Sequence, residues 1–186
     1  MEPDIGPAPF GVGHLRRVGQ GLLRIPFPVS AVPCLVWAGL IWWLSSQAVI
    51  EPPPLVPHVP LLSNLVHAIE FGFLALWSVL LLPRRDDWPV LRRGNLVRCL
   101  VATLIYAVVD EWHQSFVPNR DASLLDVLTD GVGIVSVLWV IAYLGDRRAD
   151  TRGLGRRLGF GIAACVGAAW LATFYGDTYG TGPWPS

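Results

Sequence analysis

The chain of 186 residues is long enough for one domain, and 53% of its residues are hydrophobic, with a mean hydropathy of +0.48. That composition is too apolar for a typical soluble domain and favours a protein embedded in a bilayer. Its 14 basic residues, all arginine, balance 14 carboxylates, so no excess of positive charge indicates a nucleic-acid partner. The three cysteines fall in apolar stretches, which favours small core residues over a disulfide framework or a zinc site.

Five apolar stretches follow one another, each close to the ~20 residues that an α-helix needs to cross about 30 Å of hydrocarbon. They cover residues 31–47, 64–82, 97–116, 124–144 and 158–174. Prolines break the first three connections, and glycines with charged residues fill the fourth. The first stretch lacks a convincing signal-peptidase site, so we interpret it as a retained helix. The sequence therefore predicts an all-α, polytopic transmembrane bundle of five helices.

Four segments follow from these boundaries. An N-terminal tail occupies residues 1–29, and a four-helix membrane core occupies residues 30–145. An arginine-rich loop (146–157) leads to the fifth transmembrane helix and a short tail (158–186).

Arginine is distributed unevenly between the connections. The N-terminal tail and the second and fourth connections are rich in arginine, whereas the first, the third and the C-terminal tail contain only Arg120. Short cytoplasmic loops carry an excess of Lys and Arg. The sequence therefore predicts a cytoplasmic N-terminus, cytoplasmic loops at Arg84 and Arg147, external loops at Pro54 and Asn119, and an external C-terminus.

This orientation brings the polar residues of four helices to their outer ends. Carboxylates within hydrocarbon-length segments cost about 2.5–3.5 kcal/mol each on insertion scales, so a chain that keeps several close together has a use for them. Residues three or four apart share a helix face, which allows each helix to offer a polar stripe to one outward-facing cavity. The candidates for this cavity are His67, Glu70, Asp110, Glu111, Gln114, Arg120, Asp126 and Asp130. Gly133 extends the last stripe inward and would allow close approach of a neighbouring helix.

Structural roles remain open for part of this set. Asp126 could cap the fourth helix or favour its positive N-terminal end. The polar residues 45–47 could be ordinary interfacial residues at a helix end. Asp110 and Glu111 resist such an explanation, because their helix is expected to continue outward past them to Phe116.

The region contains several short motifs: Asp110-Glu111-x-x-Gln114, Pro118-x-Arg120, Ser123-x-x-Asp126 and Gly133, with Ser45-Ser46 and His67-x-x-x-Phe71 upstream. Together they resemble the signature of the VanZ-like membrane protein family, over residues 35–145. One departure is Asp130, because the family commonly has Asn four residues after the aspartate of the third motif. The substitution adds a possible negative charge to the pocket.

The resemblance implies a multi-pass protein of the bacterial cell membrane. The family is named for a component of a glycopeptide-resistance cassette and is associated with reduced sensitivity to teicoplanin, and the resemblance implies no established reaction. We therefore expect a cell-envelope protein with an outward-facing polar pocket that binds or modifies a lipid-linked or anionic envelope substrate. Its expected partners are membrane lipids or a lipid-linked envelope precursor at the outer leaflet, and no nucleic acid.

The sequence leaves open whether the protein is an enzyme. In an enzyme, Asp110 or Glu111 would act as the base and His67 as the acid or as an orienting group. Arg120 would bind a phosphate or carboxylate through its planar fork of donors. The remaining candidates for substrate binding are Gln114, Asp126, Asp130 and Glu70.

Two other functions are considered. A proton-coupled transporter would need ionisable groups reachable from both sides, whereas the cytoplasmic halves of the helices are apolar. A structural or accessory protein would use the polar cluster only to lock the bundle, with Arg120 paired to Asp126 and His67 to Glu111.

No cofactor or metal is required by the sequence. It contains no His-Glu-x-x-His motif and no cysteine ligand, so zinc proteolysis has little support. An oxygen-ligated divalent cation at Asp110, Glu111, Asp126 and Asp130 is the metal alternative.

Overall fold

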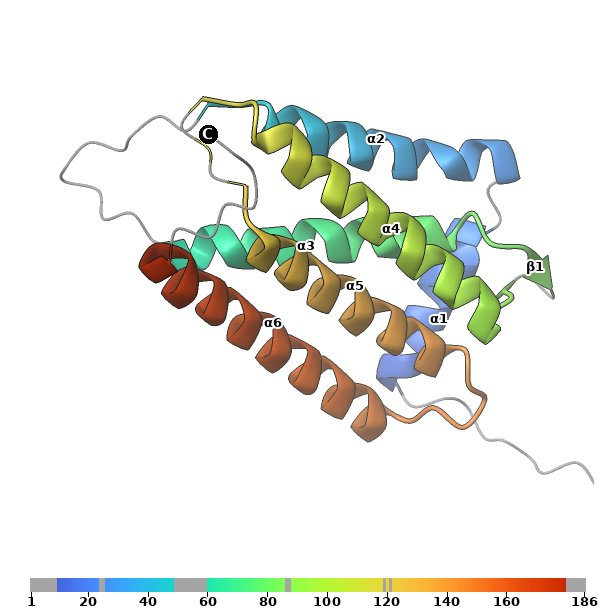
Figure 1. The fold of residues 1–186 in the computed structure, drawn as a ribbon. Helices are drawn as coiled ribbons and strands as arrows, with labels where there is room; N and C mark the ends of the chain where they lie inside the picture. The colour runs from blue at the N-terminus through green and yellow to red at the C-terminus, as the bar shows by residue number, and fades with distance from the viewer. Residues whose placement is uncertain are drawn as a thin grey trace, which may run out of the picture.

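Six helices and one short β-hairpin make up the described part of the chain, which comprises residues 10–23, 26–48, 60–85, 88–118, 120 and 122–179 of a computed structural model (Figure 1). The helices are α1 (Phe10–Leu23), α2 (Phe27–Ser45), α3 (Pro60–Val79), α4 (Arg93–Gln114), α5 (Leu124–Leu144) and α6 (Thr151–Tyr179). Strands β1 (Arg84–Arg85) and β2 (Trp88–Pro89) pair antiparallel between α3 and α4. The predicted helical fold is confirmed, and the hairpin is an addition that the sequence did not predict.

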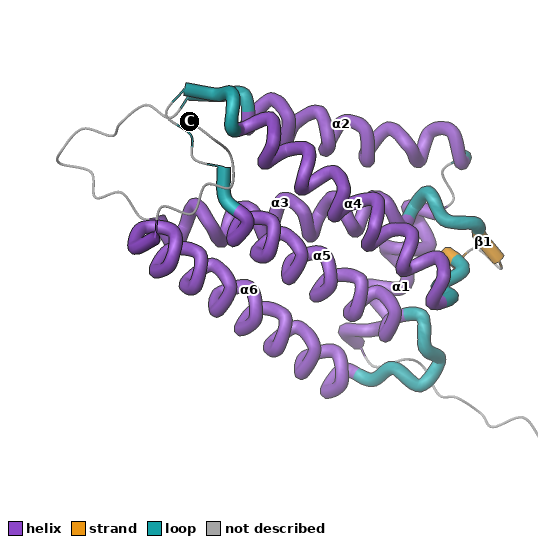
Figure 2. The backbone as a smooth tube through the Cα atoms, in the orientation of Figure 1, coloured by secondary structure: helices purple, strands orange, loops and turns teal. Residues whose placement is uncertain are grey.

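Helices α2 to α6 form a bundle in which each helix runs antiparallel to the next in the chain (Figure 1). Figure 2 shows the described connections gathered at the two ends of this bundle. Among the described residues, three segments are long and apolar enough to cross a membrane: Leu61–Val79, Leu124–Leu144 and Thr151–Tyr175. The apolar part of α2, Val29–Ser45, is shorter. A helical membrane protein is therefore supported, although this criterion counts fewer crossings than the five that were predicted.

Helix α1 lies inside the segment that the sequence analysis treated as a tail. Its Val12 side chain is fully buried against Ala149 and Leu154, and the Arg16 guanidinium donates a hydrogen bond of 2.8 Å to the Leu144 carbonyl. With 14 residues, α1 is shorter than a membrane crossing, so a search for long apolar stretches missed it. Helix α2 also starts within the predicted tail, at Phe27.

Two further boundaries differ from the predictions. The predicted arginine-rich loop (146–157) is partly helical, because α6 begins at Thr151. Asp150 caps this helix through its Oδ1, which accepts a hydrogen bond from the Gly153 N–H. Helix α4 ends at Gln114 and does not continue to Phe116, and its C-cap is Ser115. The carboxylates of α4 therefore lie in its last turns.

The closest helix crossing joins α3 and α5. A Cβ atom added at Gly133 would lie 2.1 Å from the carbonyl oxygen of Ala68, a distance that no side chain can occupy. Gly72, one turn further along α3, lies against Gly133 and Val137. The predicted close approach at Gly133 is thus confirmed, and it holds the two helices together near their middle.

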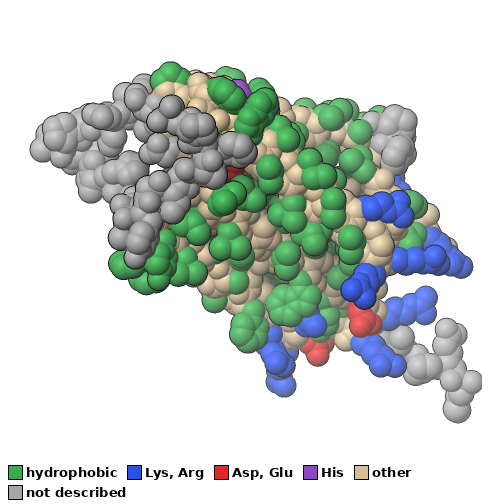
Figure 3. Space-filling view, in the orientation of Figure 1, with side chains coloured by type: hydrophobic (Ala, Val, Ile, Leu, Met, Phe, Trp, Pro, Cys, Tyr) green, Lys and Arg blue, Asp and Glu red, His purple; other side chains and the backbone are tan. Residues whose placement is uncertain are grey.

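The sides of the bundle are apolar and one end is basic. Figure 3 shows hydrophobic side chains across the middle of the visible face and Lys or Arg side chains gathered at one end. Exposed apolar residues come from several helices, including Leu35, Ile105, Val135 and Ile162. An apolar surface of this extent suits contact with lipid.

Candidate functional site

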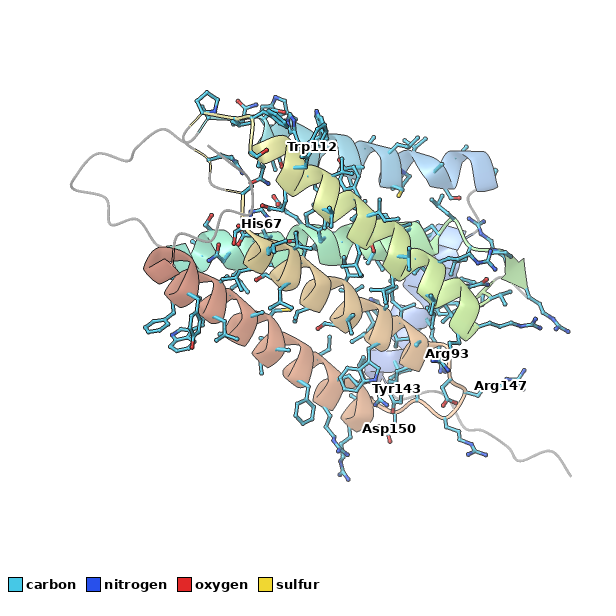
Figure 4. All side chains as sticks on the ribbon, viewed as in Figure 1. His67, Arg93, Trp112, Tyr143, Arg147 and Asp150 are labelled. Atoms are coloured by element: carbon cyan, nitrogen blue, oxygen red, sulfur yellow. The ribbon has the colours of Figure 1, made fainter. Side chains whose placement is uncertain are left out.

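The polar side chains gather at one end of the bundle, where α2 and α4 end and α3 and α5 begin. Figure 4 labels His67 at this end and Arg93, Tyr143, Arg147 and Asp150 at the other. Of the eight predicted site residues, seven lie in the helix turns near this end or in the α4–α5 connection, whereas Glu70 lies at the middle of α3, one turn beyond His67. Four of them are buried: Asp110, Glu111, Gln114 and Asp130. The other four are half-buried: His67, Glu70, Arg120 and Asp126.

One group, which we call the Asp110 network, consists of Ser45, Asp110, Gln114 and Arg120. The Asp110 Oδ2 accepts hydrogen bonds from the Ser45 hydroxyl and from the Gln114 side-chain amide, both at 2.8 Å. The Gln114 Oε1 in turn accepts a hydrogen bond of 3.1 Å from the Arg120 guanidinium. The network therefore ties the C-terminal turns of α2 and α4 to the loop that follows α4.

Arg120 also covers the end of α2. Its guanidinium donates to the carbonyl oxygens of Leu44 and Gln47, at 3.0 and 3.2 Å. The last carbonyls of a helix have no partner within the helix and carry partial negative charge. Three of the five N–H donors of Arg120 are thus used by protein acceptors, a structural function that suits a residue at a helix terminus.

Glu111 points to a different neighbour. Its Oε2 accepts a hydrogen bond of 2.9 Å from the backbone N–H of Ser123, the residue that begins α5. The Ser123 hydroxyl caps the helix by accepting from the Leu125 N–H at 3.1 Å. The suggestion that Asp126 caps this helix is therefore wrong, because Ser123 is the N-cap. Asp126 lies in the first turn, where a negative charge still interacts favourably with the helix dipole.

The second group, which we call the His67 cluster, consists of His67, Glu111 and Asp130. The His67 Nδ1 lies 3.6 Å from Asp130 Oδ1, and one ligand atom from each of the three residues lies within 4.8 Å of the others. A separation of 3.6 Å is too long for a hydrogen bond. The exposed fraction is 13% for the His67 side chain, 3% for Glu111 and 0% for Asp130.

Several atoms of the His67 cluster have no hydrogen-bond partner in the part of the chain that the structure describes. They are His67 Nδ1, Glu111 Oε1 and both carboxylate oxygens of Asp130. Asp110 Oδ1, at the edge of the other group, shares this property. Buried polar atoms are normally paired, so a concentration of unpaired ones indicates a place where a further ligand fits.

The surroundings of the His67 cluster are acidic. Asp126 lies close enough to interact electrostatically with His67, Glu111 and Asp130. Glu70 interacts in the same way with His67. Among the described residues of this end, the carboxylates outnumber the side chains that could carry positive charge, which are Arg120, His67 and His113. The arrangement favours a cation, a hydrogen-bond donor or a proton.

Some residues of this end were not identified as site residues from the sequence. Ser45, treated as an interfacial residue, is buried and donates to Asp110. Thr129 is fully buried beside Asp130, and its hydroxyl donates to the Leu125 carbonyl. Helical spacing relates residues within one helix, so it could not show that Ser45 meets a carboxylate 65 positions away.

The opposite end of the bundle is basic. An open cavity of about 570 Å³ is lined there by Arg84, Arg85, Arg92 and Arg98, with Asn95 among its other residues. The two ends therefore differ in charge, as the sequence predicted from the distribution of arginine.

Comparison with known proteins agrees with the motifs. The VanZ/LLP1 family matches residues 24–145, a region that spans α2 to α5 and contains both polar groups. No curated protein and no solved structure matches the chain. Since the match covers well over half of the sequence, the chain belongs to the VanZ/LLP1 family.

Proposed function

We propose that the protein is a multi-pass membrane protein of the bacterial cell envelope that binds, through the His67 cluster, the polar headgroup of a lipid-linked or anionic substrate at the outer leaflet. The observation that carries this proposal is the set of buried atoms on His67, Glu111 and Asp130 that have no hydrogen-bond partner within the described part of the chain. Their helices meet at the end of the bundle opposite Arg93 and Arg147.

The proposed orientation places five helices, α2 to α6, across the membrane. The alternation of helix direction and the basic end of the bundle support it, because cytoplasmic loops carry an excess of arginine. The N-terminus would then be cytoplasmic and the C-terminus external.

Energetics supports a binding role for the His67 cluster. An ionised carboxylate that is buried without partners costs several kcal/mol, and a ligand that brings positive charge or hydrogen-bond donors would offset that cost. If the protein is an enzyme, Glu111 and Asp130 are the candidate bases and His67 the acid or orienting group. Asp126 and Glu70 remain candidates for substrate binding.

A structural role is favoured for the other group. The carboxylate of Asp110 receives two hydrogen bonds, and Arg120 is held by Gln114 and by carbonyls of α2. We propose that the Asp110 network locks α2 to α4 and positions the helix ends around the His67 cluster. Three of the five N–H donors of Arg120 are used by acceptors in the described part of the chain, so contact with an anionic headgroup remains within its capacity.

A transporter is less well supported. The buried carboxylates among the described residues, Asp110, Glu111 and Asp130, all lie at one end. The buried polar residues nearer the arginine end, such as Ser78 and Asn95, are uncharged. A carrier would be expected to have ionisable groups near the midplane that are reachable from both sides.

Cysteine labelling tests the orientation. In a variant with Cys34, Cys99 and Cys165 replaced, an impermeant thiol reagent applied to intact cells should label Pro54→Cys and not Arg85→Cys. Positions 54 and 119, the predicted external positions, lie outside the described residues. Labelling at 85 with none at 54 would reverse the orientation and remove the His67 cluster from the outer leaflet.

Retention of lipid tests the binding role. Native mass spectrometry of the protein purified from bacterial membranes should detect a bound lipid species that is depleted in Asp130→Asn. The matched control is Asp146→Asn, which makes the same change at the arginine end. Identical lipid content in all three proteins would contradict the proposal. Teicoplanin susceptibility of cells that express the same three proteins would show whether the site acts in glycopeptide resistance.

A further inference from the structure

We infer that His67, Glu111 and Asp130 form a binding site for a divalent transition-metal cation, of the Zn²⁺ or Mn²⁺ class, at the outer end of the bundle. The three residues come from α3, α4 and α5, and only folding brings them together. The metal site stands independently of the headgroup proposal, whereas its use to bind a phosphate rests on that proposal.

One of the separations in the cluster suits two ligands of a single ion. One atom from each residue lies within 4.8 Å of the others, and His67 Nδ1 is 3.6 Å from Asp130 Oδ1. Ligands about 2.1 Å from a tetrahedral ion lie roughly 3.4 Å from each other. The His67–Asp130 separation is therefore too long for a hydrogen bond and close to the separation of two ligands of one ion.

The unpaired atoms are a second, independent observation. Asp130 is fully buried, yet neither of its carboxylate oxygens has a hydrogen-bond partner among the described residues. His67 Nδ1 and Glu111 Oε1 likewise have no hydrogen-bond partner in the described ranges. A metal ion would occupy these lone pairs together, which no single hydrogen-bond donor could do.

A neighbouring contact supports the geometry of the site. One oxygen of Glu111, Oε2, accepts a hydrogen bond from the Ser123 N–H, which fixes the orientation of the carboxylate. Partners of this kind position metal ligands in known sites. Thr129 and Gly133 flank Asp130 on α5, and the tight crossing at Gly133 holds His67 on α3 opposite it.

The donor set selects the class of ion. Imidazole suits Zn²⁺ and other transition metals, whereas carboxylates also suit Mn²⁺ and Mg²⁺. One imidazole with two carboxylates therefore favours Zn²⁺ or Mn²⁺ over Ca²⁺ or Mg²⁺. Two carboxylates neutralise the charge of the ion, and three protein ligands leave a coordination position open, as in catalytic zinc sites.

An ion at this position would resolve a conflict in the electrostatics. The acidic surroundings of the cluster would repel a phosphate or carboxylate headgroup, whereas a bound divalent cation attracts one. Asp126 lies nearby and could supply a fourth ligand or orient a water molecule. The ligand set differs from the four carboxylates considered from the sequence, because the cluster with ligand atoms within 4.8 Å of one another consists of His67, Glu111 and Asp130, whereas Asp110 Oδ2 accepts hydrogen bonds from Ser45 and Gln114.

Direct metal binding tests the inference. Full-length, tag-free protein in detergent should be stripped with a chelator, dialysed against Zn²⁺, Mn²⁺ or Mg²⁺ separately, and analysed for metal content by mass spectrometry. We expect one Zn²⁺ or Mn²⁺ per chain and little Mg²⁺. Asp130→Asn and His67→Gln should each weaken binding by at least ten-fold, whereas Asp146→Asn should bind as the wild type does.

A second variant keeps the test valid if the first one misfolds. If Asp130→Asn does not elute as a folded protein, Glu111→Gln carries the test, because it preserves an oxygen for the Ser123 N–H. Loading with Co²⁺ should produce a visible absorption band that is lost in His67→Gln. Substoichiometric metal in the wild type, or binding that survives His67→Gln and Asp130→Asn but is lost in Asp110→Asn, would overturn the inference.

The two proposals can fail separately. Lipid retained by a protein that binds no metal would refute the metal site and leave the headgroup proposal. Stoichiometric metal binding without any bound lipid would support the metal site and refute the headgroup proposal.

Discussion

The Asp110 network and the His67 cluster use adjacent carboxylates of the same helix in opposite ways. The Asp110 side chain contacts α2 and accepts two hydrogen bonds at one of its oxygens. The Glu111 side chain contacts the start of α5, where one oxygen accepts from the Ser123 N–H, and its other oxygen has no hydrogen-bond partner among the described residues. Neighbouring residues of a helix point about 100° apart, so they meet different partners. The comparison teaches that a row of acidic residues in a sequence can combine a structural lock with a binding site.

The two groups should also differ in the size of their contribution to stability. A hydrogen bond to a charged group contributes about 1.5–3 kcal/mol, so the loss of Asp110 leaves partners unpaired and is costly. Asp130 accepts no hydrogen bond among the described residues, and its Oδ1 lies 3.6 Å from His67 Nδ1, so neutralising it should cost less than removing Asp110. Thermal unfolding in detergent can separate these cases, since about 1 kcal/mol shifts the midpoint by roughly 2–4 °C in a chain of this length.

The largest effect is expected for Gly133→Ala. The added methyl would lie 2.1 Å from the Ala68 carbonyl, so α3 and α5 must separate. Overpacking of this kind costs about 3 kcal/mol, or roughly 6–12 °C in the unfolding midpoint, and should disrupt the His67 cluster more than the Asp110 network. Gly159→Ala on α6 is the control, because no atom lies within 4 Å of its added Cβ. Equal unfolding midpoints for both variants would contradict the close contact between α3 and α5 at Gly133.

A smaller loss is expected for Asp110→Ala. The Ser45 hydroxyl and the Gln114 amide would both lose their acceptor, at a cost of about 2 kcal/mol, or roughly 4–8 °C. Asp110→Asn keeps one acceptor oxygen and should lose less. A wild-type midpoint for Asp110→Ala, measured by thermal unfolding, would show that the Asp110 network is not a lock.

Arg120→Gln should have a moderate effect. Glutamine cannot reach the carbonyls of Leu44 and Gln47 while it contacts Gln114, so about 1 kcal/mol is lost, or roughly 2–4 °C. Arg120→Lys should recover part of this stability, because a single ammonium group can still bind one carbonyl. If neither variant changes the midpoint but both lose bound lipid, Arg120 acts on an anion and belongs functionally with the His67 cluster.

The smallest effect is expected for Asp130→Asn in metal-free protein. The substitution removes a buried charge that accepts no hydrogen bond among the described residues and lies 3.6 Å from His67 Nδ1, so the midpoint should stay within about 2 °C of the wild type. Added Zn²⁺ should raise the midpoint of the wild type and not that of the variant, because a ligand stabilises only the state that binds it. A large loss of stability in metal-free Asp130→Asn would mean that Asp130 has a structural partner.

The sequence predicted the bundle and the end at which its polar residues meet, because both depend on local properties. Helix length, apolar content and arginine position can be read from single segments. Because consecutive helices run in opposite directions, alternate connections lie at the same end of the bundle. The close crossing at Gly133 was predicted for the same reason, since a glycine on a polar helix face permits approach of any neighbour. Helix α1 was missed because a short amphipathic helix depends on its docking against α5 and α6 for its stability.

Only the tertiary structure decided which polar residues belong to the Asp110 network and which to the His67 cluster. Spacing within α4 placed Asp110 and Glu111 at the same end, but the packing of α2 and α5 on either side of α4 decided that Ser45 meets one and Ser123 the other. The separation of His67 from Asp130 depends in the same way on how closely α3 crosses α5. Hydrogen bonds and metal coordination act over a few ångströms between different helices, and a sequence specifies such distances only through the packing of the whole bundle.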